Sequence, residues 1–295
     1  MRVNPNPLPD LLSAVSQTQQ LINQDLEQIS SGQTINKPSD NPAGAAMLVR
    51  NANQTAEADQ FLRSASGLSG ELQNADSALN SVITSLKRAI SLGVEGANGT
   101  LNDSDRAAIA SEVQGIQSDL LNLANLSYQG KFVFAGTATQ TAPYVGDSTS
   151  ASGVRYVGNS TVNQVTVGNH LSVAANMPGS ELFSGNGTDM FQSVQDLVTS
   201  LQSGTNIDAA VSEVSNSYNH ISAQRVFYGN AMNQLNSQQT FLNSETTQLA
   251  AQQNTIAGTD LAKVVSDLVN AQTSRQATLE AIAQTQQTNL FNFIK

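Results

Sequence analysis

Apolar residues recur at alternating intervals of four and three positions along the chain, and this spacing limits its possible folds more than any other feature. The spacing is that of the a and d positions of a heptad repeat, which place an apolar stripe along one side of a helix. The first stripe consists of Leu8, Leu12, Val15, Gln19, Ile22, Leu26 and Ile29. A second stripe has no polar interruption and consists of Phe61, Ala65, Leu68, Leu72, Ala75, Leu79, Val82, Leu86 and Ala89.

The C-terminal third of the sequence has a similar pattern. Seven residues fall seven positions apart: Val214, Ile221, Tyr228, Leu235, Leu242, Leu249 and Ile256. The last segment continues with Leu261, Val265, Leu268, Leu279 and Ile282, and is interrupted by Gln272 and Arg275. One amphipathic helix cannot bury its own stripe, so all these segments require partner helices.

Stripes at both ends of the sequence are accommodated most simply if the N-terminal and C-terminal segments pair with each other. We therefore predict a mainly α fold, in which these segments form a long heptad-patterned helical bundle or coiled-coil rod around a small β-rich inserted domain. The same pattern also suits any other soluble helical bundle.

Proline and glycine separate this insert from the helical flanks. There is no proline between Pro42 and Pro143 and none after Pro178, so both flanks permit long helices. Nine of the 20 glycines lie between residues 130 and 187, among β-favouring runs at 131–134, 154–157 and 162–167. We predict an N-terminal helical region at 1–130, a β-rich insert at 131–188 and a C-terminal helical region at 189–295.

Composition excludes several classes of function. The protein has no cysteine, which excludes disulfides, thiolate metal sites and a cysteine nucleophile. Its 13 Lys and Arg are scattered over a sequence of net charge −10, which argues against nucleic-acid binding. It has neither an apolar run long enough to span a membrane nor the apolar core of a secretory signal, so we expect no membrane insertion, and either a cytoplasmic protein or export by a route without such a signal.

A search for catalytic groups is negative. His170 and His220 lie in different segments and have no metal-ligand spacing, so each is expected to be structural. The sequence also lacks a nucleophile elbow, a Walker loop and a dinucleotide-binding glycine motif. We expect no enzyme activity, no cofactor and no metal, and interpret the molecule as an interaction protein.

Residues 29–44 read ISSGQTINKPSDNPAG and resemble the N-terminal signature of the flagellin family, in which a heptad helix ends at Ser-Ser-Gly and a turn leads to a second helix. Gly32 can adopt the left-handed conformation that ends a helix, and Pro38 and Pro42 prevent one helix from running through. These three residues form the predicted turn motif. Residues 95–105 are also similar to the family, as are residues 260–268, Gln272-Thr273 and Leu290-Phe291 near the C-terminus.

Further motifs resemble one branch of that family, the hook-associated junction proteins, more than the filament flagellins. They are GKFVFAGT at 130–137, PY at 143–144, YVGN at 156–159 and PGSELF at 178–183. The sequence departs from the family at Pro5, Pro7 and Pro9, which favour an extended start before the first helix.

The resemblance implies a structural adaptor at the junction of hook and filament in the bacterial flagellum. It implies export through the flagellar type III apparatus without a cleaved signal peptide, and terminal helices that become ordered against neighbours during assembly. The implied partners are hook-associated protein 1, flagellin, further copies of the same protein in a ring and a flagellar export chaperone. The residues expected to make these contacts are Leu12, Val15, Ile22, Leu26, Ile29, Leu261, Val265, Leu268, Leu279 and Ile282.

Two other interpretations remain open from the sequence. The protein could be a short filament flagellin, which would polymerise into long filaments. It could also be a glycan-binding adhesin or fibre-type coiled coil, because the insert is rich in Asn, Ser and Thr. A trimeric stalk of that kind needs no matching stripes at both ends of the sequence, which favours the flagellar interpretation.

Overall fold

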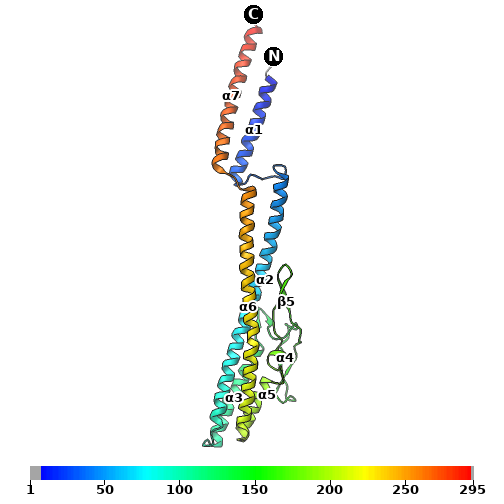
Figure 1. Cartoon of the computed structure of the whole chain (residues 1–295), viewed down its shortest axis with the longest axis vertical. Helices are drawn as coiled ribbons and strands as arrows, with labels where there is room; N and C mark the ends of the chain where they lie inside the picture. The colour runs from blue at the N-terminus through cyan, green and yellow to red at the C-terminus, as the bar shows by residue number, and fades with distance from the viewer. Residues whose placement is uncertain (1–7, 294–295) are drawn as a thin grey trace. The chain divides into compact units, whose positions relative to one another are not determined.

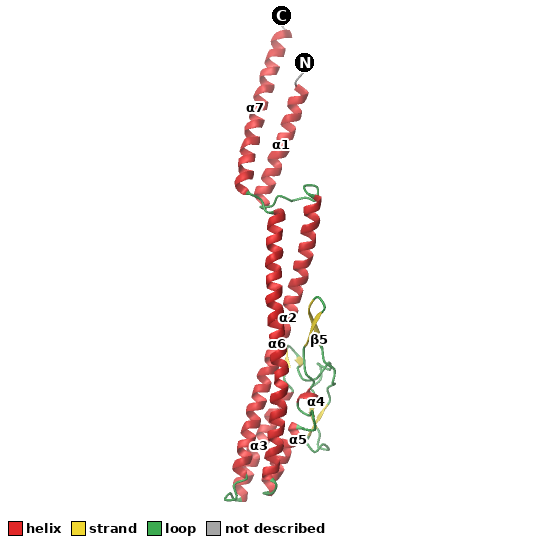
Figure 2. Ribbon diagram, in the orientation of Figure 1, coloured by secondary structure: helices red, strands yellow, loops and turns green. Residues whose placement is uncertain are grey.

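The computed structural model describes residues 8–293, with side chains described up to residue 286 (Figure 1). The described residues form long helices and six short strands, and these strands all lie between residues 127 and 174 (Figure 2). The predicted mainly α class with a small β-containing part is confirmed. The elements are α1 Leu8–Ser31, α2 Pro42–Gly96, α3 Asp103–Ala124, β1 Ser127–Tyr128, β2 Lys131–Phe132, β3 Tyr144–Gly146, β4 Val154–Tyr156, β5 Gln164–Gly168, β6 Leu171–Ala174, α4 Gly179–Leu182, α5 Met190–Ser203, α6 Ile207–Ala257 and α7 Leu261–Phe293.

The protein divides into two compact units. The first contains residues up to Glu57 and from Ser244 onward, and the second contains Ala58–Asn243. The long helices α2 and α6 contribute residues to both units. The sequence-based division at residues 130 and 188 stays a prediction.

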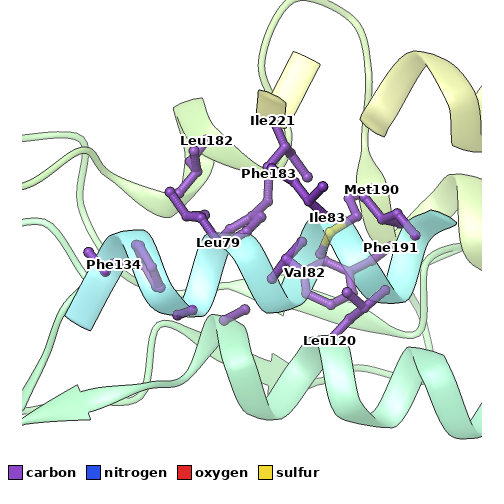
Figure 3. Close-up of a cluster of buried hydrophobic side chains, with 14 of the residues drawn as sticks. Leu79, Val82, Ile83, Leu120, Phe134, Leu182, Phe183, Met190, Phe191 and Ile221 are labelled. Carbon is purple, nitrogen blue, oxygen red and sulfur yellow. The ribbon is translucent and has the colours of Figure 1, made fainter. Parts of the chain in front are cut away.

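The core of the second unit is built on the heptad stripes of α2 and α6. In the predicted α2 stripe, Ala65, Leu72, Leu79 and Leu86 are completely buried. In the predicted seven-residue series of α6, Val214, Ile221, Tyr228 and Leu235 are completely buried as well. Helices α3 and α5 add their own apolar faces, and Leu79, Leu120, Phe191 and Ile221 meet in one cluster (Figure 3). The bundle therefore buries apolar side chains that would be exposed to solvent on a single helix.

Capping residues set where the shorter helices of this unit begin and end. The side chain of Asn102 accepts a hydrogen bond from the amide of Asp105 at 2.9 Å and so caps the start of α3. Asp189 caps α5 by accepting from the amides of Phe191 and Gln192. Gly204 ends α5 in the left-handed conformation, with φ of 69°.

An ion pair fixes the register between α2 and α6. Arg225 follows Ile221 of the buried α6 stripe by four residues. It donates two hydrogen bonds to the carboxylate of Asp76, at 2.5 and 2.8 Å, and a third to Asn80. Both charged side chains are partly shielded from solvent. The two parallel hydrogen bonds from the guanidinium group to the carboxylate can form at only one alignment of the helices, so they oppose sliding of α2 along α6.

The strands form three separate antiparallel hairpins, β1 with β2, β3 with β4 and β5 with β6. Sequence patterns predicted β2, β4 and β5 within longer runs but missed their partners β1, β3 and β6. The β3–β4 hairpin is anchored by an aromatic cluster in which the ring of Tyr144 packs against Tyr156, Phe183 and Phe191. The Tyr144 hydroxyl also donates to the carbonyl of Gly179 at 2.8 Å, so packing rather than an extended sheet holds the insert.

Leu79→Ala is expected to lower the free energy of unfolding by about 2–5 kcal/mol, because truncation of a fully buried leucine leaves a cavity in the core. Val94→Ala on the same helix removes a side chain that is 60% exposed, and is expected to change stability by less than about 0.5 kcal/mol. Urea denaturation followed by circular dichroism compares the two variants. Equal effects would contradict the assignment of the α2 stripe to the core.

Candidate functional site

Helices α1 and α7 lie side by side in the first unit and run antiparallel (Figure 1). Their contact is narrow. Among the side chains described, up to residue 286, its buried apolar residues are Ile22 of α1 and Val264, Ala271 and Ile282 of α7. A two-helix pair with so few buried side chains gains little from its own packing, because helices of this length depend on tertiary contacts for much of their stability.

The structure divides the ten predicted contact residues into three groups. Ile22 and Ile282 are buried, and Val15, Ile29 and Leu268 are half-buried. The other five are exposed: Leu12, Leu26, Leu261, Val265 and Leu279. The α1/α7 contact therefore brings together only about half of the predicted set.

Sequence reasoning missed Val264 and Ala271. These two residues follow the same heptad period as the predicted α7 stripe, but the buried stripe that they form shares only Leu268 and Ile282 with it. Adjacent valines at 264 and 265 made the assignment ambiguous, because either one continues a heptad. Only the buried position of Val264 shows which stripe faces α1.

A second apolar stripe on α7 remains exposed. Leu261 is 51% exposed, Val269 54% and Leu279 45%, and Val265 lies between them. At 100° per residue these four side chains fall within about a quarter turn of the helix, directly beside the buried stripe. Leu12 and Leu26 form a corresponding stripe beside Ile22 on α1. Solvent-exposed apolar stripes of this kind mark surfaces that bind other proteins.

Charged groups near the contact do not hold the pair strongly. Lys263 pairs with Asp267 along α7 at 2.9 Å, and Lys37 pairs with Glu27 at 2.8 Å, but both pairs are largely exposed. Asp25 lies on the contact side of α1, where burial, and then the negative charge of Asp267, raise the pKa of its carboxyl group; the positive charge of Lys263 opposes this.

The three predicted turn residues lie between the end of α1 and the first residue of α2. Gly32 has φ of 69°, and its amide donates to the carbonyl of Gln28 at 2.9 Å, which ends α1. Pro38 is the second residue of a turn closed by a hydrogen bond from the Asp40 amide to the Lys37 carbonyl. Pro42 is the first residue of α2, where its missing N–H costs nothing.

The segment between α1 and α2 pairs with the one between α6 and α7. Gln33 and Gly258 form an isolated antiparallel bridge. The amide of Thr34 donates to the carbonyl of Ala257 at 2.7 Å, and the amide of Thr259 donates to the carbonyl of Gly32 at 3.2 Å. The two connections are thus joined by backbone hydrogen bonds, and the sequence has no period or motif that predicts this contact.

Each histidine lies in a local structural setting. His170 sits in the β5–β6 turn with φ of 62°, and His220 Nε2 lies 2.9 Å from the carbonyl oxygen of Glu181. Within residues 8–293, no cluster of His, Asp and Glu side chains is suited to hold a metal ion.

None of the described helices is both long enough and apolar enough to cross a lipid bilayer.

Comparison with known proteins relates both helical ends of the molecule to one family. Residues 9–139 match the family model for the bacterial flagellin N-terminal helical region, and residues 206–294 match that for the C-terminal helical region. Flagellar hook-associated protein 3 of Escherichia coli is 26% identical over 91% of this chain and 92% of its own length. Flagellin A of Vibrio cholerae is 30% identical, but the match covers 43% of this chain and 34% of that protein.

Solved structures have the same fold. The crystal structure of Bacillus cereus FlgL matches with a TM-score of 0.61 at 20% identity, over 70% of this chain and 99% of that one. The flagellar junction protein FlgL from Legionella pneumophila matches with a TM-score of 0.62 at 15% identity, over 72% and 99% respectively.

Gly258→Ala is expected to weaken the paired connections, because the added Cβ would lie 2.3 Å from the carbonyl oxygen of Asn254. Local destabilisation by more than about 1 kcal/mol should raise the hydrogen-exchange rates of the Thr34 and Thr259 amides about fivefold or more. Gly67→Ala is the matched control, since Gly67 lies within α2 and nothing surrounds its Cβ position. Unchanged exchange at both amides in the Gly258 variant would show that the bridge does not depend on this glycine.

Proposed function

The protein belongs to the flagellin family, and we propose that it is the structural adaptor at the junction between the hook and the filament of a bacterial flagellum. The observation that carries the proposal is the similarity to hook-associated protein 3 over about nine-tenths of both sequences. Flagellin A of Vibrio cholerae aligns over less than half of either sequence. The similarity to hook-associated protein 3 therefore includes the insert as well as the helical ends shared by the whole family.

In the proposed mechanism, assembly buries the apolar stripes that the single molecule exposes. Leu12 and Leu26 of α1, and Leu261, Val265 and Leu279 of α7, pack against neighbouring subunits. Burial of these side chains offsets the entropy lost when the terminal helices are fixed in place. The buried residues Ile22 and Ile282 act earlier, by holding α1 and α7 together so that their stripes are presented jointly.

The proposed partners follow from this position in the flagellum. Further copies of the protein form a ring, hook-associated protein 1 lies on the hook side and flagellin on the filament side. Before assembly, a flagellar export chaperone covers the α7 stripe, since an exposed apolar surface of this length would otherwise promote aggregation. The protein reaches its site outside the cell through the flagellar type III apparatus, without a cleaved signal peptide.

We propose a mechanical role without catalysis, cofactor or metal. The β-containing insert then has no part in chemistry. Its β3–β4 hairpin is packed through the Tyr144 aromatic cluster, which contains no residue of α1 or α7. We expect the insert to stay folded when α1 and α7 are altered.

The adaptor role is tested by deletion of the gene in the source bacterium and electron microscopy of the cells. The expected result is hooks without attached filaments, with flagellin released into the medium. Re-expression of the protein should restore filaments. Normal filaments in the deletion strain would reject the proposal, and long homopolymers formed by the purified protein would favour a filament flagellin instead.

Leu279→Asp is expected to abolish assembly while leaving the isolated protein folded. Leu279 is exposed, so a carboxylate there is hydrated in the free molecule but would be buried unpaired between subunits. Filament-bearing cells should fall about tenfold or more in the complemented deletion strain, since one buried unpaired charge costs several kcal/mol. Binding to the export chaperone should also weaken.

The matched control is Asn270→Asp, which adds the same charge at an exposed position on the opposite side of α7. It should support normal filament numbers. Leu268 and Ile282 are less suitable positions, because they lie against α1 and their loss would also disturb the helical pair. Normal assembly of the Leu279→Asp variant would exclude this stripe from the subunit contact.

A further inference from the structure

Asparagine is followed by glycine at two positions, and in both cases threonine comes next: Asn98-Gly99-Thr100 and Asn186-Gly187-Thr188. The first lies in the turn between α2 and α3, and the second lies between α4 and α5. All four Asn and Gly residues are exposed, and nothing surrounds the Cβ position of either glycine. The same tripeptide therefore occurs twice in one unit of one molecule, and only its conformation differs.

At the first site, Thr100 holds the carboxamide oxygen of Asn98. The Thr100 amide donates to Asn98 Oδ1 at 3.2 Å, and the Thr100 hydroxyl donates to the same oxygen at 3.0 Å. These bonds orient the carboxamide group of Asn98 over the backbone that follows it. Among the described backbone hydrogen bonds, none uses the amide of Gly99 as donor.

At the second site, Thr188 bonds to a backbone carbonyl and not to the asparagine side chain. The hydroxyl and the amide of Thr188 both donate to the carbonyl of Gly185, at 2.7 and 3.1 Å. Asn186 and Gly187 have φ of 55° and 78°, and no hydrogen bond to the Asn186 carboxamide is found within the described residues. The carboxamide oxygen of Asn186 thus lacks both donors that Asn98 has.

These two donors matter for one reaction that needs no reagent but water. In deamidation, the backbone nitrogen of the next residue bonds to Cγ of asparagine, and its proton passes to hydroxide. The bond between Cγ and Nδ2 then breaks as Nδ2 takes a proton from water, so that ammonia leaves and hydroxide is regenerated. Water opens the cyclic imide that remains to aspartate or isoaspartate. Negative charge develops on Oδ1 during the attack, and hydrogen-bond donors directed at that oxygen stabilise it.

We propose that Asn98 is a site of spontaneous deamidation, with Thr100 as the residue that promotes it. Gly99 offers an unobstructed nitrogen, and the two Thr100 donors stabilise the oxyanion as it forms. The product adds a negative charge at the C-terminal end of α2, where the helix dipole disfavours it and where Glu95 already lies. Its isoaspartate form also lengthens the backbone of the turn, which is closed by the bond from the Leu101 amide to the Asn98 backbone carbonyl at 3.0 Å.

The test follows both sites by peptide mapping and mass spectrometry during incubation of the purified full-length protein in mildly alkaline buffer. Asn98 is expected to deamidate faster than Asn186. Thr100→Val removes the hydroxyl donor and keeps the branched shape of the side chain. It should lower the deamidation rate of Asn98 by about two- to tenfold, the factor that corresponds to one hydrogen bond in water. Thr188→Val is the matched control and should not slow Asn186, because its hydroxyl bonds to Gly185 instead.

A parallel incubation in concentrated urea separates conformation from sequence. The rates at the two sites should converge there, since the tripeptides are identical and the turns are lost. Equal rates in the native protein, an unchanged Asn98 rate in the Thr100→Val variant, or a difference that persists in urea would each overturn the proposal.

Discussion

The apolar stripe shared by α2 and α6 is the interaction on which the rest of the second unit depends. Leu72 and Leu79 of α2 and Tyr228 of α6 are completely buried, and the ion pair between Asp76 and Arg225 fixes how the two helices align. Helix α3 then packs onto this core through Leu120, and α5 through Phe191 (Figure 3). Tyr144 of the β3–β4 hairpin packs against Phe191 in turn. Without the aligned pair, these elements would have no common surface to cover.

The first unit has the same heptad period, but only part of its apolar surface is buried within the molecule. Its contact between α1 and α7 buries Ile22, Val264, Ala271 and Ile282, while neighbouring leucines of α1, and neighbouring leucines and valines of α7, stay exposed. A sequence that serves only the folded single molecule gains nothing from a second stripe, because exposed apolar residues invite aggregation. The doubled pattern is understandable if each helix has one stripe for its partner within the molecule and one for neighbouring subunits.

The sequence predicted those features that depend on local periodicity or local stereochemistry. The α2 and α6 stripes, the Gly32 turn and the strands β2, β4 and β5 were of this kind, because each signal lies within a few residues of its effect. The strands β1, β3 and β6, the choice of Val264 over Val265 and the bridge between Gln33 and Gly258 were not predictable. Each depends on which distant segment lies opposite, and residues of similar polarity could fill either role.

Low charge connects the composition to the proposed assembly. The ion pairs found in the described residues lie mostly at the surface, where each contributes about 0–1 kcal/mol, so apolar burial is the main source of stability. Charged groups at a subunit contact must lose water or find partners, whereas the amides and hydroxyls that replace them here are less costly to desolvate. A protein with only 12% charged residues can thus pack against several neighbours around exposed apolar stripes without matching charges at every contact. The specificity of such contacts then rests on the positions of the stripes, which the α1/α7 pair and the joined connections at Gln33 and Gly258 fix relative to each other.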